Sequence, residues 1–218
     1  NSRAIKLDRT SIKAYLDRYC PDPILRRFIE VAYTNEYGLE VNRQSSINLL
    51  LLIGKDPNKI EIFGSSDQRY QIRGGNQQIV DKLAAKLSDR IEMNTRLESI
   101  RSHAKNRYRV SLRQGDASKE YTFDRVILAL PFSILRQIDI GVRLPAVKQA
   151  AIKEIGYGTN TKVITSYSDR LWRNKYKSNG ESFSDLDTSE TWEASRYNDT
   201  KAGIITSFSG GDLGIKIG

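Results

Sequence analysis

The sequence predicts an α+β fold in which two domains are interleaved along the chain. Three observations support this fold class. The first third carries apolar residues at helical spacing, the middle combines one amphipathic helix with alternating strand patterns, and the last third returns to strands after a further helix. Because the chain leaves a helical layer, enters a mixed layer and then comes back, we expect interleaved rather than sequential domains.

Three consecutive helices are predicted in the first third. Residues 11–20 place two isoleucine or leucine side chains and two tyrosines at helical spacing. Residues 24–38 repeat this pattern until Gly38 stops it, and residues 44–54 give a third helix that ends at Gly54. Together these segments predict a small helical layer.

The middle of the chain reads as a piece of an α/β layer. An extended segment over 59–75 ends in a glycine pair, and residues 76–90 have one apolar face and begin at Asn76, a good N-cap. Two short strands are predicted over 91–102, and the segments 107–115 and 120–131 follow, the first with alternation in Tyr108, Val110 and Leu112. The continuous apolar run at 126–130 predicts a strand that is buried on both faces.

The last third begins with a helix over 145–156, which is opened by proline and closed by Gly156. Three apolar or alternating segments then predict strands, at 161–167, 189–198 and 202–211. The chain therefore ends in a sheet layer.

Composition excludes several classes of protein. Apolar residues make up 39% and charged residues 28% of the 218 residues, as in ordinary globular proteins. With one cysteine (Cys20) and one histidine (His103), no disulfide framework and no zinc site of the Cys/His type is expected, and no other metal site is predicted. No segment approaches the roughly 20 apolar residues that span a bilayer, so we expect a cytoplasmic protein that makes no membrane contact.

The net charge of +9 raises the question of an anionic partner. The lysines and arginines are scattered, and no dense basic run with interleaved aromatic residues is present. We therefore expect no nucleic-acid partner, while a cofactor phosphate or another anion stays open.

Four segments in register resemble the flavin-containing amine oxidase family, especially the bacterial monoamine and L-amino acid oxidases. They are "FGSSDQRYQIRGGNQQIVDKLAAKL", "FDRVILALPFSILRQI", "LPAVKQAAIKEIGYGTNTKV" and "RLW". The resemblance covers roughly residues 35–211. It implies FAD as the cofactor and a substrate domain with a mixed sheet flanked by helices, interleaved with part of an FAD-binding α/β domain.

The resemblance also implies domain boundaries. Residues 1–66 would be the helical part of the substrate domain, residues 67–140 a partial FAD-binding domain, and residues 141–218 the sheet part of the substrate domain. The G-x-G-x-x-G turn that cradles the FAD pyrophosphate is missing, since Gly74–Gly75 and Gly210–Gly211 lack a third glycine at the required offset. The chain thus resembles a central fragment, and we expect it alone to bind FAD weakly or not at all.

Lys162 is the candidate catalytic residue. From its position alone, at the head of an apolar strand, it is either a solvated strand end or a charge held for chemistry. By resemblance it corresponds to the family's lysine that hydrogen-bonds through a water to flavin N5. Gly156 and Gly158 precede it and would allow the backbone to approach closely.

Other site residues follow from the resemblance. Leu97 corresponds to the strand residue whose main chain meets the adenine ring, and Ala129 and Pro131 end the strand beside the FAD adenosine. Phe63 and Gln68 fall where the family lines the substrate cavity.

The expected function is that of a fragment of an FAD-dependent oxidoreductase. Such an enzyme oxidises the C–N bond of a primary or secondary amine, or of an L-amino acid, to an imine, and O₂ reoxidises the flavin. The isolated chain is expected to be inactive, and a homodimer is one assembly that the sequence allows. The alternative is a non-catalytic binding module that uses a basic surface for an anionic partner.

Overall fold

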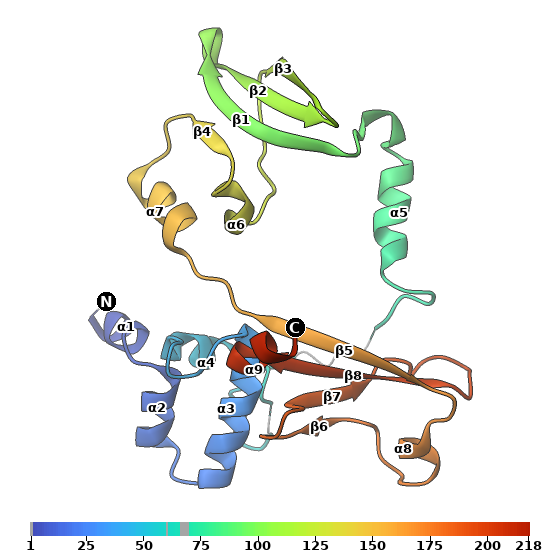
Figure 1. Cartoon of the computed structure of the whole chain (residues 1–218). Coiled ribbons are helices and arrows are strands. Elements are labelled where there is room, and N and C mark those ends of the chain that lie inside the picture. Colours follow the sequence, from blue (N-terminus) through green and yellow to red (C-terminus); the bar gives the residue numbers. More distant parts are fainter. Residues whose placement is uncertain (1, 60, 66–69) are drawn as a thin grey trace. The chain divides into compact units, whose positions relative to one another are not determined.

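The computed structural model describes residues 2–59, 61–65 and 70–218. The chain forms two compact units (Figure 1): the first consists of Asn1–Asp67 and Gly158–Gly218, and the second, Gln68–Tyr157, is inserted between them. The second boundary lies after Tyr157 and not after residue 140. The reason is that helix α7 (Ala146–Glu154) packs against α6 (Phe132–Leu135), where Arg136 donates a hydrogen bond to the Ile152 carbonyl (2.6 Å).

Local capping explains where the helices of the first unit begin and end. The Ser11 side chain accepts a hydrogen bond from the Ala14 amide (3.1 Å), and Asp22 accepts one from the Leu25 amide (2.8 Å). Gly38 ends the third helix with a φ of 63°. The helices are α1 (Ser2–Asp8), α2 (Ile12–Tyr19), α3 (Pro23–Tyr37), α4 (Ser46–Leu52), α8 (Leu171–Asn174) and α9 (Gly211–Ile217).

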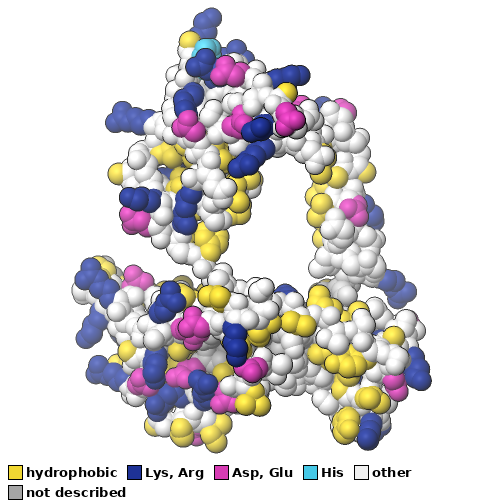
Figure 2. All heavy atoms as spheres, in the orientation of Figure 1, with side chains coloured by type: hydrophobic (Ala, Val, Ile, Leu, Met, Phe, Trp, Pro, Cys, Tyr) yellow, Lys and Arg dark blue, Asp and Glu magenta, His cyan; other side chains and the backbone are white. Residues whose placement is uncertain are grey.

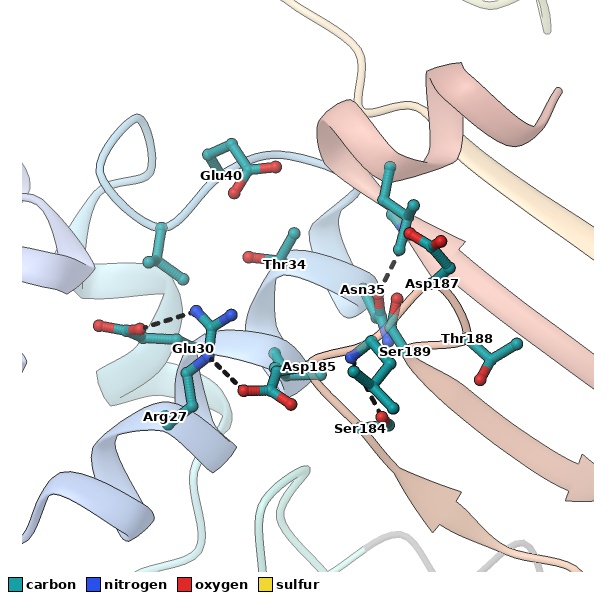
Figure 3. A pocket seen from close by; sticks show the side chains of 15 residues that line it. Arg27, Glu30, Thr34, Asn35, Glu40, Ser184, Asp185, Asp187, Thr188 and Ser189 are labelled. Atoms are coloured by element: carbon teal, nitrogen blue, oxygen red, sulfur yellow. Dashed lines mark hydrogen bonds and ion pairs between the residues drawn. The ribbon is translucent and has the colours of Figure 1, made fainter.

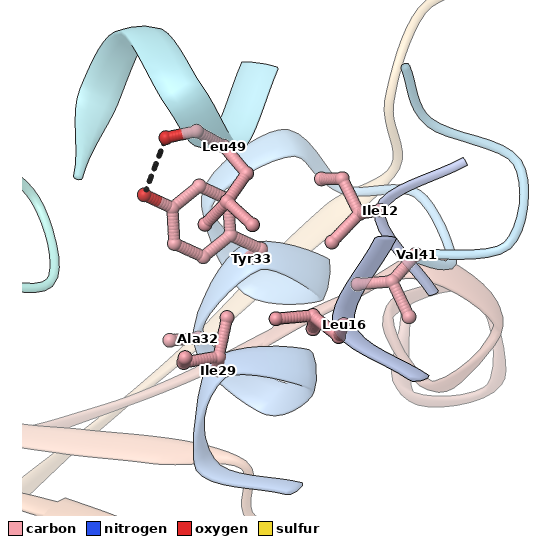
Figure 4. Close-up of a cluster of buried hydrophobic side chains, with 7 residues drawn as sticks. All are labelled: Ile12, Leu16, Ile29, Ala32, Tyr33, Val41 and Leu49. Atoms are coloured by element: carbon pink, nitrogen blue, oxygen red, sulfur yellow. Dashed lines mark hydrogen bonds between the residues drawn. The ribbon is translucent and has the colours of Figure 1, made fainter. Parts of the chain in front are cut away.

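A buried cluster holds α2, α3 and α4 together (Figure 4). The Tyr33 hydroxyl lies within this core and donates to the carbonyls of Ile62 (2.9 Å) and Leu49 (3.4 Å). Burial raises the pKa of Tyr33, so the phenol stays protonated and can keep donating. The cluster consists of Ile12, Leu16, Ile29, Ala32, Tyr33, Val41 and Leu49.

The sheet of the first unit is antiparallel, with the strand order β5-β8-β7-β6. Its strands match the three segments predicted in the last third, plus one short strand. They are β5 (Asn160–Tyr167), β6 (Ser182–Phe183), β7 (Glu190–Glu193) and β8 (Gly203–Gly210).

The second unit contains a mixed sheet of order β3-β2-β1-β4, in which β1 and β4 are parallel. Helix α5 precedes this sheet, and short 3₁₀ turns cover Ser88–Arg90 and Ala104–Asn106. The remaining bounds are α5 (Gln77–Ala85), β1 (Thr95–His103), β2 (Arg107–Gln114), β3 (Ala117–Phe123) and β4 (Asp139–Gly141).

Three predictions for the middle of the chain are wrong. Residues 91–102 contribute to one strand, β1, rather than two, and residues 62–65 form a turn rather than extended chain. The run 126–130 is not a strand, and Ile127 is 90% exposed. A buried strand needs hydrogen-bonded neighbours on both sides, and the described sheets give this run none.

Lys and Arg side chains are scattered among acidic and neutral ones on the face seen in Figure 2. In the described part of the chain, no helix has the length and apolar character that crossing a membrane would require.

Gly158 marks a close contact between two chain segments of the first unit. The Gly38 carbonyl accepts a hydrogen bond from the Thr159 amide (2.7 Å), and a Cβ on Gly158 would overlap the Tyr37 carbonyl oxygen. The close approach at Gly158 is therefore made to the end of α3. A Cβ on Gly156 would meet nothing within 4 Å.

We expect Gly158→Ala to lower the free energy of unfolding of the first unit by about 1–3 kcal/mol, because overlapping backbone atoms must move apart. Gly156→Ala, only two residues away, is the matched control and should be neutral or slightly stabilising. Urea unfolding of both variants checks this. Equal stability of the two variants would contradict the close contact.

Candidate functional site

One face of the first unit's sheet carries a row of side chains that crosses all four strands. In the register of the sheet, Lys162 of β5 lies opposite Phe208 of β8, Phe208 lies opposite Glu190 of β7, and Glu190 lies opposite Phe183 of β6. Directly paired residues of antiparallel strands point to the same face, and so does Trp192, two residues after Glu190. We call Lys162, Phe208, Glu190, Phe183 and Trp192 the lysine row.

Lys162 is exposed to solvent, and its ammonium lies over two aromatic rings of the row. Its Nζ is 5.0 Å from the ring centroid of Phe208 and 5.3 Å from that of Trp192. Ring quadrupoles attract a cation at such distances. The structure therefore gives a solvated ammonium that is held by aromatic faces, and not a charge buried inside the unit.

Glu190 is the acidic member of the row, and it is partly buried. Burial raises its pKa to about 7, and the negative charge of Glu36 contributes to the rise, whereas the nearby Asn35 amide and the Lys162 ammonium lower it. Its carboxyl group is therefore divided between the neutral and the ionised form near neutral pH. Since one strand separates β7 from β5, the backbones of Glu190 and Lys162 are about 10 Å apart.

Phe63 lies beside the far end of the lysine row. Its ring centroid is 6.4 Å from that of Phe183 and 6.1 Å from that of Tyr33. Phe28 of α3 meets Phe183 edge-on at 5.0 Å. Phe63 thus shares an aromatic cluster with the row, and its role in lining a substrate cavity stays a prediction. Gln68, its predicted neighbour in that cavity, lies outside the described residues.

A polar cavity of about 690 Å³ lies next to the row, between α3 and the loop that joins β6 to β7 (Figure 3). Arg27 pairs with Glu30 (3.4 Å) within α3 and with Asp185 (3.5 Å) of the loop, and Asp187 pairs with Lys216 (3.6 Å) of α9. The ion pairs of Asp185 and Asp187 attach the loop to α3 and α9.

Trp172 lies on the opposite face of the sheet from Lys162. Its indole donates a hydrogen bond to the Glu193 carboxylate (2.9 Å). Glu193 lies opposite Ile205 in the β7–β8 register and directly follows Trp192, so its side chain points to the face opposite the lysine row. Glu193 is only 2% exposed and also pairs with Arg170 (3.3 Å) and Arg173. Trp172 therefore belongs to a buried ionic cluster and not to the lysine row.

The predicted cofactor residues lie in the second unit. Leu97 is partly buried in β1, opposite Leu112, next to an irregularity in the strand register. Ala129 and Pro131 are exposed in the irregular segment that precedes α6. Their roles stay predictions.

Sequence reasoning missed four members of the lysine row, namely Phe183, Glu190, Trp192 and Phe208. A signal was present, because Glu190 and Trp192 alternate within "SETWEA" and must share one face of any strand formed there. Phe208 joins them only through the strand register, which the sequence does not reveal.

Comparisons with known proteins all find flavin-containing amine or amino-acid oxidases. The family profile described as flavin containing amine oxidoreductase matches residues 25–217. An L-amino-acid oxidase of Vipera ammodytes ammodytes is 25% identical over 154 residues, which are 70% of this chain and 31% of that protein. A flavin-containing amine oxidase of Danio rerio is 24% identical over 170 residues, which are 77% of this chain and 32% of that protein.

Among solved structures, wild-type putrescine oxidase bound to putrescine matches with a TM-score of 0.79 and 20% identity, over 100% of this chain and 48% of that one. This likeness in fold confirms the predicted fold class, with a mixed sheet flanked by helices. The chain spans about a third of the length of the two curated relatives and about half of the solved structure.

Proposed function

The chain belongs to the flavin-containing amine oxidoreductase family, and we propose that it supplies the substrate side of an FAD-dependent amine oxidation. The reaction would convert the C–N bond of an amine or an L-amino acid to an imine, with O₂ as the final electron acceptor. The observation that carries this proposal is the lysine row, in which Lys162 lies over two aromatic rings and shares one face of the sheet with the carboxyl group of Glu190.

Lys162 would position a water molecule at the edge of the flavin. Its ammonium can donate up to three hydrogen bonds, and Phe208 and Trp192 hold it without using any of them. Such a cation can orient water and favour negative charge that develops nearby. This role rests on the resemblance of "GYGTNTKV" to the family, together with the geometry of the row.

FAD, when bound, supplies the two-electron oxidation itself. The residues present fit only part of an FAD site. Lys162 suits the flavin edge, while Leu97, Ala129 and Pro131 would meet the adenosine end. Nothing in the sequence provides the glycine-rich turn for the pyrophosphate.

We expect the isolated chain to purify without a stoichiometric flavin, because the pyrophosphate would have to bind without its glycine turn and helix N-terminus. Absorbance of the purified chain in the flavin band, before and after incubation with FAD and gel filtration, measures this. A flavin band of one equivalent that survives gel filtration would contradict the expectation.

Glu190 is the residue that we propose binds the amino group of the substrate. Putrescine, the ligand of the similar solved structure, carries two amino groups. In this chain Glu190 lies on the Lys162 face, and Glu36 and Glu181 add negative charge around it. These acids would favour a cationic group, while Phe183 and Phe208 flank Glu190 in the row and would cover an apolar chain. We therefore favour a diamine over a monoamine or an L-amino acid.

Binding of 1,4-diaminobutane should strengthen about tenfold between pH 6 and pH 8, because Glu190, with a pKa of about 7, ionises in this window while the amine stays protonated. Glu36, Glu181 and Lys162 are the charged groups around it. Calorimetric titration of the chain at several pH values measures this, and Glu190→Gln should remove the pH dependence.

The matched control is Glu154→Gln, which changes an exposed carboxylate in the second unit and should leave binding unchanged. Diamine affinity that is the same in Glu190→Gln and in the unchanged chain, at every pH, would rule out Glu190 as the anchor. Amine oxidation could then still hold for monoamines or L-amino acids.

The alternative function is a non-catalytic module that binds an anionic partner. The net charge of +9 favours it. Amine binding at the lysine row would speak for the enzyme. Salt-dependent binding of nucleic acid, with no amine binding, would speak for the module.

A further inference from the structure

A second site, distant in sequence from the lysine row, lies in the groove between α1 and α2. The groove has a volume of about 480 Å³, and Leu50 of α4 also lines it. Its cationic side chains are Arg3, Lys6 and Arg18, and its aromatic ones are Tyr15 and Tyr19. Neither the proposed oxidation nor the buried core cluster uses these charges.

The charge of the groove is of one sign. Among the described residues, its lining includes three cations and no carboxylate, although both helices carry acids. Asp17 of α2 is engaged by Lys13 (3.1 Å) and Arg26 (3.2 Å), and Asp8 of α1 accepts a hydrogen bond from the Ser45 hydroxyl (2.9 Å). Lys and Arg side chains gather over α1 in Figure 2.

Two of the three cations are available to a ligand. Within the described ranges, neither Lys6 nor Arg18 forms an ion pair. Both side chains are exposed, and the Arg18 guanidinium lies 5.3 Å from the ring centroid of Tyr19. A guanidinium that is oriented by a ring still presents its N–H groups at the edge, where a carboxylate or phosphate accepts hydrogen bonds from them.

The remaining surface of the groove is apolar and aromatic. The rings of Tyr15 and Tyr19 lie 4.7 Å apart at a tilt of 45°, and Leu7 and Leu50 are partly buried beside them. Such rings offer faces and edges against which a planar group can pack. The volume lies within the range typical of small-molecule sites, about 300–1,000 Å³, and is too small for a folded partner.

We propose that this groove binds a small planar organic anion. Its phosphate or carboxylate would lie between Lys6 and Arg18, and its flat apolar part would pack on Tyr15 and Tyr19. This ligand differs in charge from the amine at the lysine row, so the two sites do not compete for one compound.

The test separates the charged half of such a ligand from the flat half. The probes are phenyl phosphate, which has both features, inorganic phosphate, which has only the charge, and phenol, which has only the ring. Calorimetric or NMR titration of the 218-residue chain should show phenyl phosphate binding at least tenfold more tightly than either other probe. Raising salt from about 0.05 M to about 0.5 M should weaken it.

Arg18→Gln and Lys6→Gln should each weaken phenyl phosphate binding about tenfold, which is the value of one hydrogen bond to a charged group. Arg9→Gln is the matched control, because Arg9 is exposed close to the same helices but does not line the groove. Circular dichroism checks that all three variants keep their helices.

Three results would overturn the proposal. The first is phenyl phosphate binding that is no tighter than that of inorganic phosphate or phenol. The second is an equal loss of binding in Arg9→Gln and Arg18→Gln. The third is a single-stranded oligonucleotide that binds more tightly than phenyl phosphate with the same dependence on Arg18, which would assign the surface to nucleic acid.

Discussion

Replacing Lys162 with methionine should slow amine oxidation by about a hundredfold or more in an FAD-loaded protein that contains this chain. Methionine keeps much of the length of the side chain and its contact with Phe208 and Trp192 but removes the ammonium. Because Lys162 is proposed to orient water and not to hold the substrate, kcat should fall while KM stays nearly constant. Stopped-flow absorbance, which follows flavin reduction by amine and then reoxidation by O₂, separates the two half-reactions.

Two variants control this experiment. Lys201→Met removes an exposed lysine from the loop between β7 and β8 and should leave both half-reactions unchanged. Lys162→Arg keeps the cation and should recover part of the lost rate. Wild-type rates of both half-reactions in Lys162→Met would show that the ammonium takes no part in the chemistry.

Replacing Glu193 with alanine should lower the free energy of unfolding of the first unit by about 3–5 kcal/mol, the usual cost of breaking a buried ion pair. The carboxylate is 2% exposed and accepts hydrogen bonds from Trp172 and from the Ser195 hydroxyl (3.1 Å). Its removal leaves the guanidinium groups of Arg170 and Arg173 without their acidic partner. Urea unfolding, followed by tryptophan fluorescence, measures the loss.

The same carboxylate predicts a pH dependence. Burial alone would raise the pKa of Glu193, but hydrogen bonds from Trp172, Arg173 and Ser195 and the charge of Arg173 outweigh it and lower the pKa below 4.5. A lowered pKa in the folded state gives stability that is present above about pH 4.5 and is lost as the pH falls through the folded value. The stability difference between wild type and Glu193→Ala should therefore shrink in acid.

Glu154→Ala is the comparison for this series, since it removes an exposed carboxylate and should change stability by less than about 0.5 kcal/mol. If Glu193→Ala unfolds at the same urea concentration as the Glu154→Ala control, the buried ionic cluster contributes nothing to stability.

The sequence predicted α2, α3, α4, α5 and α7, whose signals are local, and it missed α1, α8 and α9. Ser11 and Asp22 cap two helices through their own side chains, and Gly38 ends one by adopting a left-handed conformation. Each of these effects depends on residues within one or two turns. By contrast, the run 126–130 needed partner strands that no local pattern specifies, and there the prediction was wrong.

The candidate site also contains one residue that a local pattern reveals and others that depend on long-range strand pairing. Lys162 could be singled out because it stands in a contiguous stretch that resembles a family. Glu190 and Phe208 meet it only when β7, β8 and β5 pair in one particular register. Register is set by long-range packing, so a single sequence could place each residue on a strand but could not align the three.

The most direct test of amine oxidation is the anaerobic addition of amines to an FAD-loaded protein that contains this chain, with the oxidised-flavin absorbance recorded. We expect loss of that absorbance with 1,4-diaminobutane, and no loss with 1,4-butanediol, which has the same carbon chain and no amine. A flavin that is bound but stays oxidised with diamines, monoamines and L-amino acids alike would contradict this expectation.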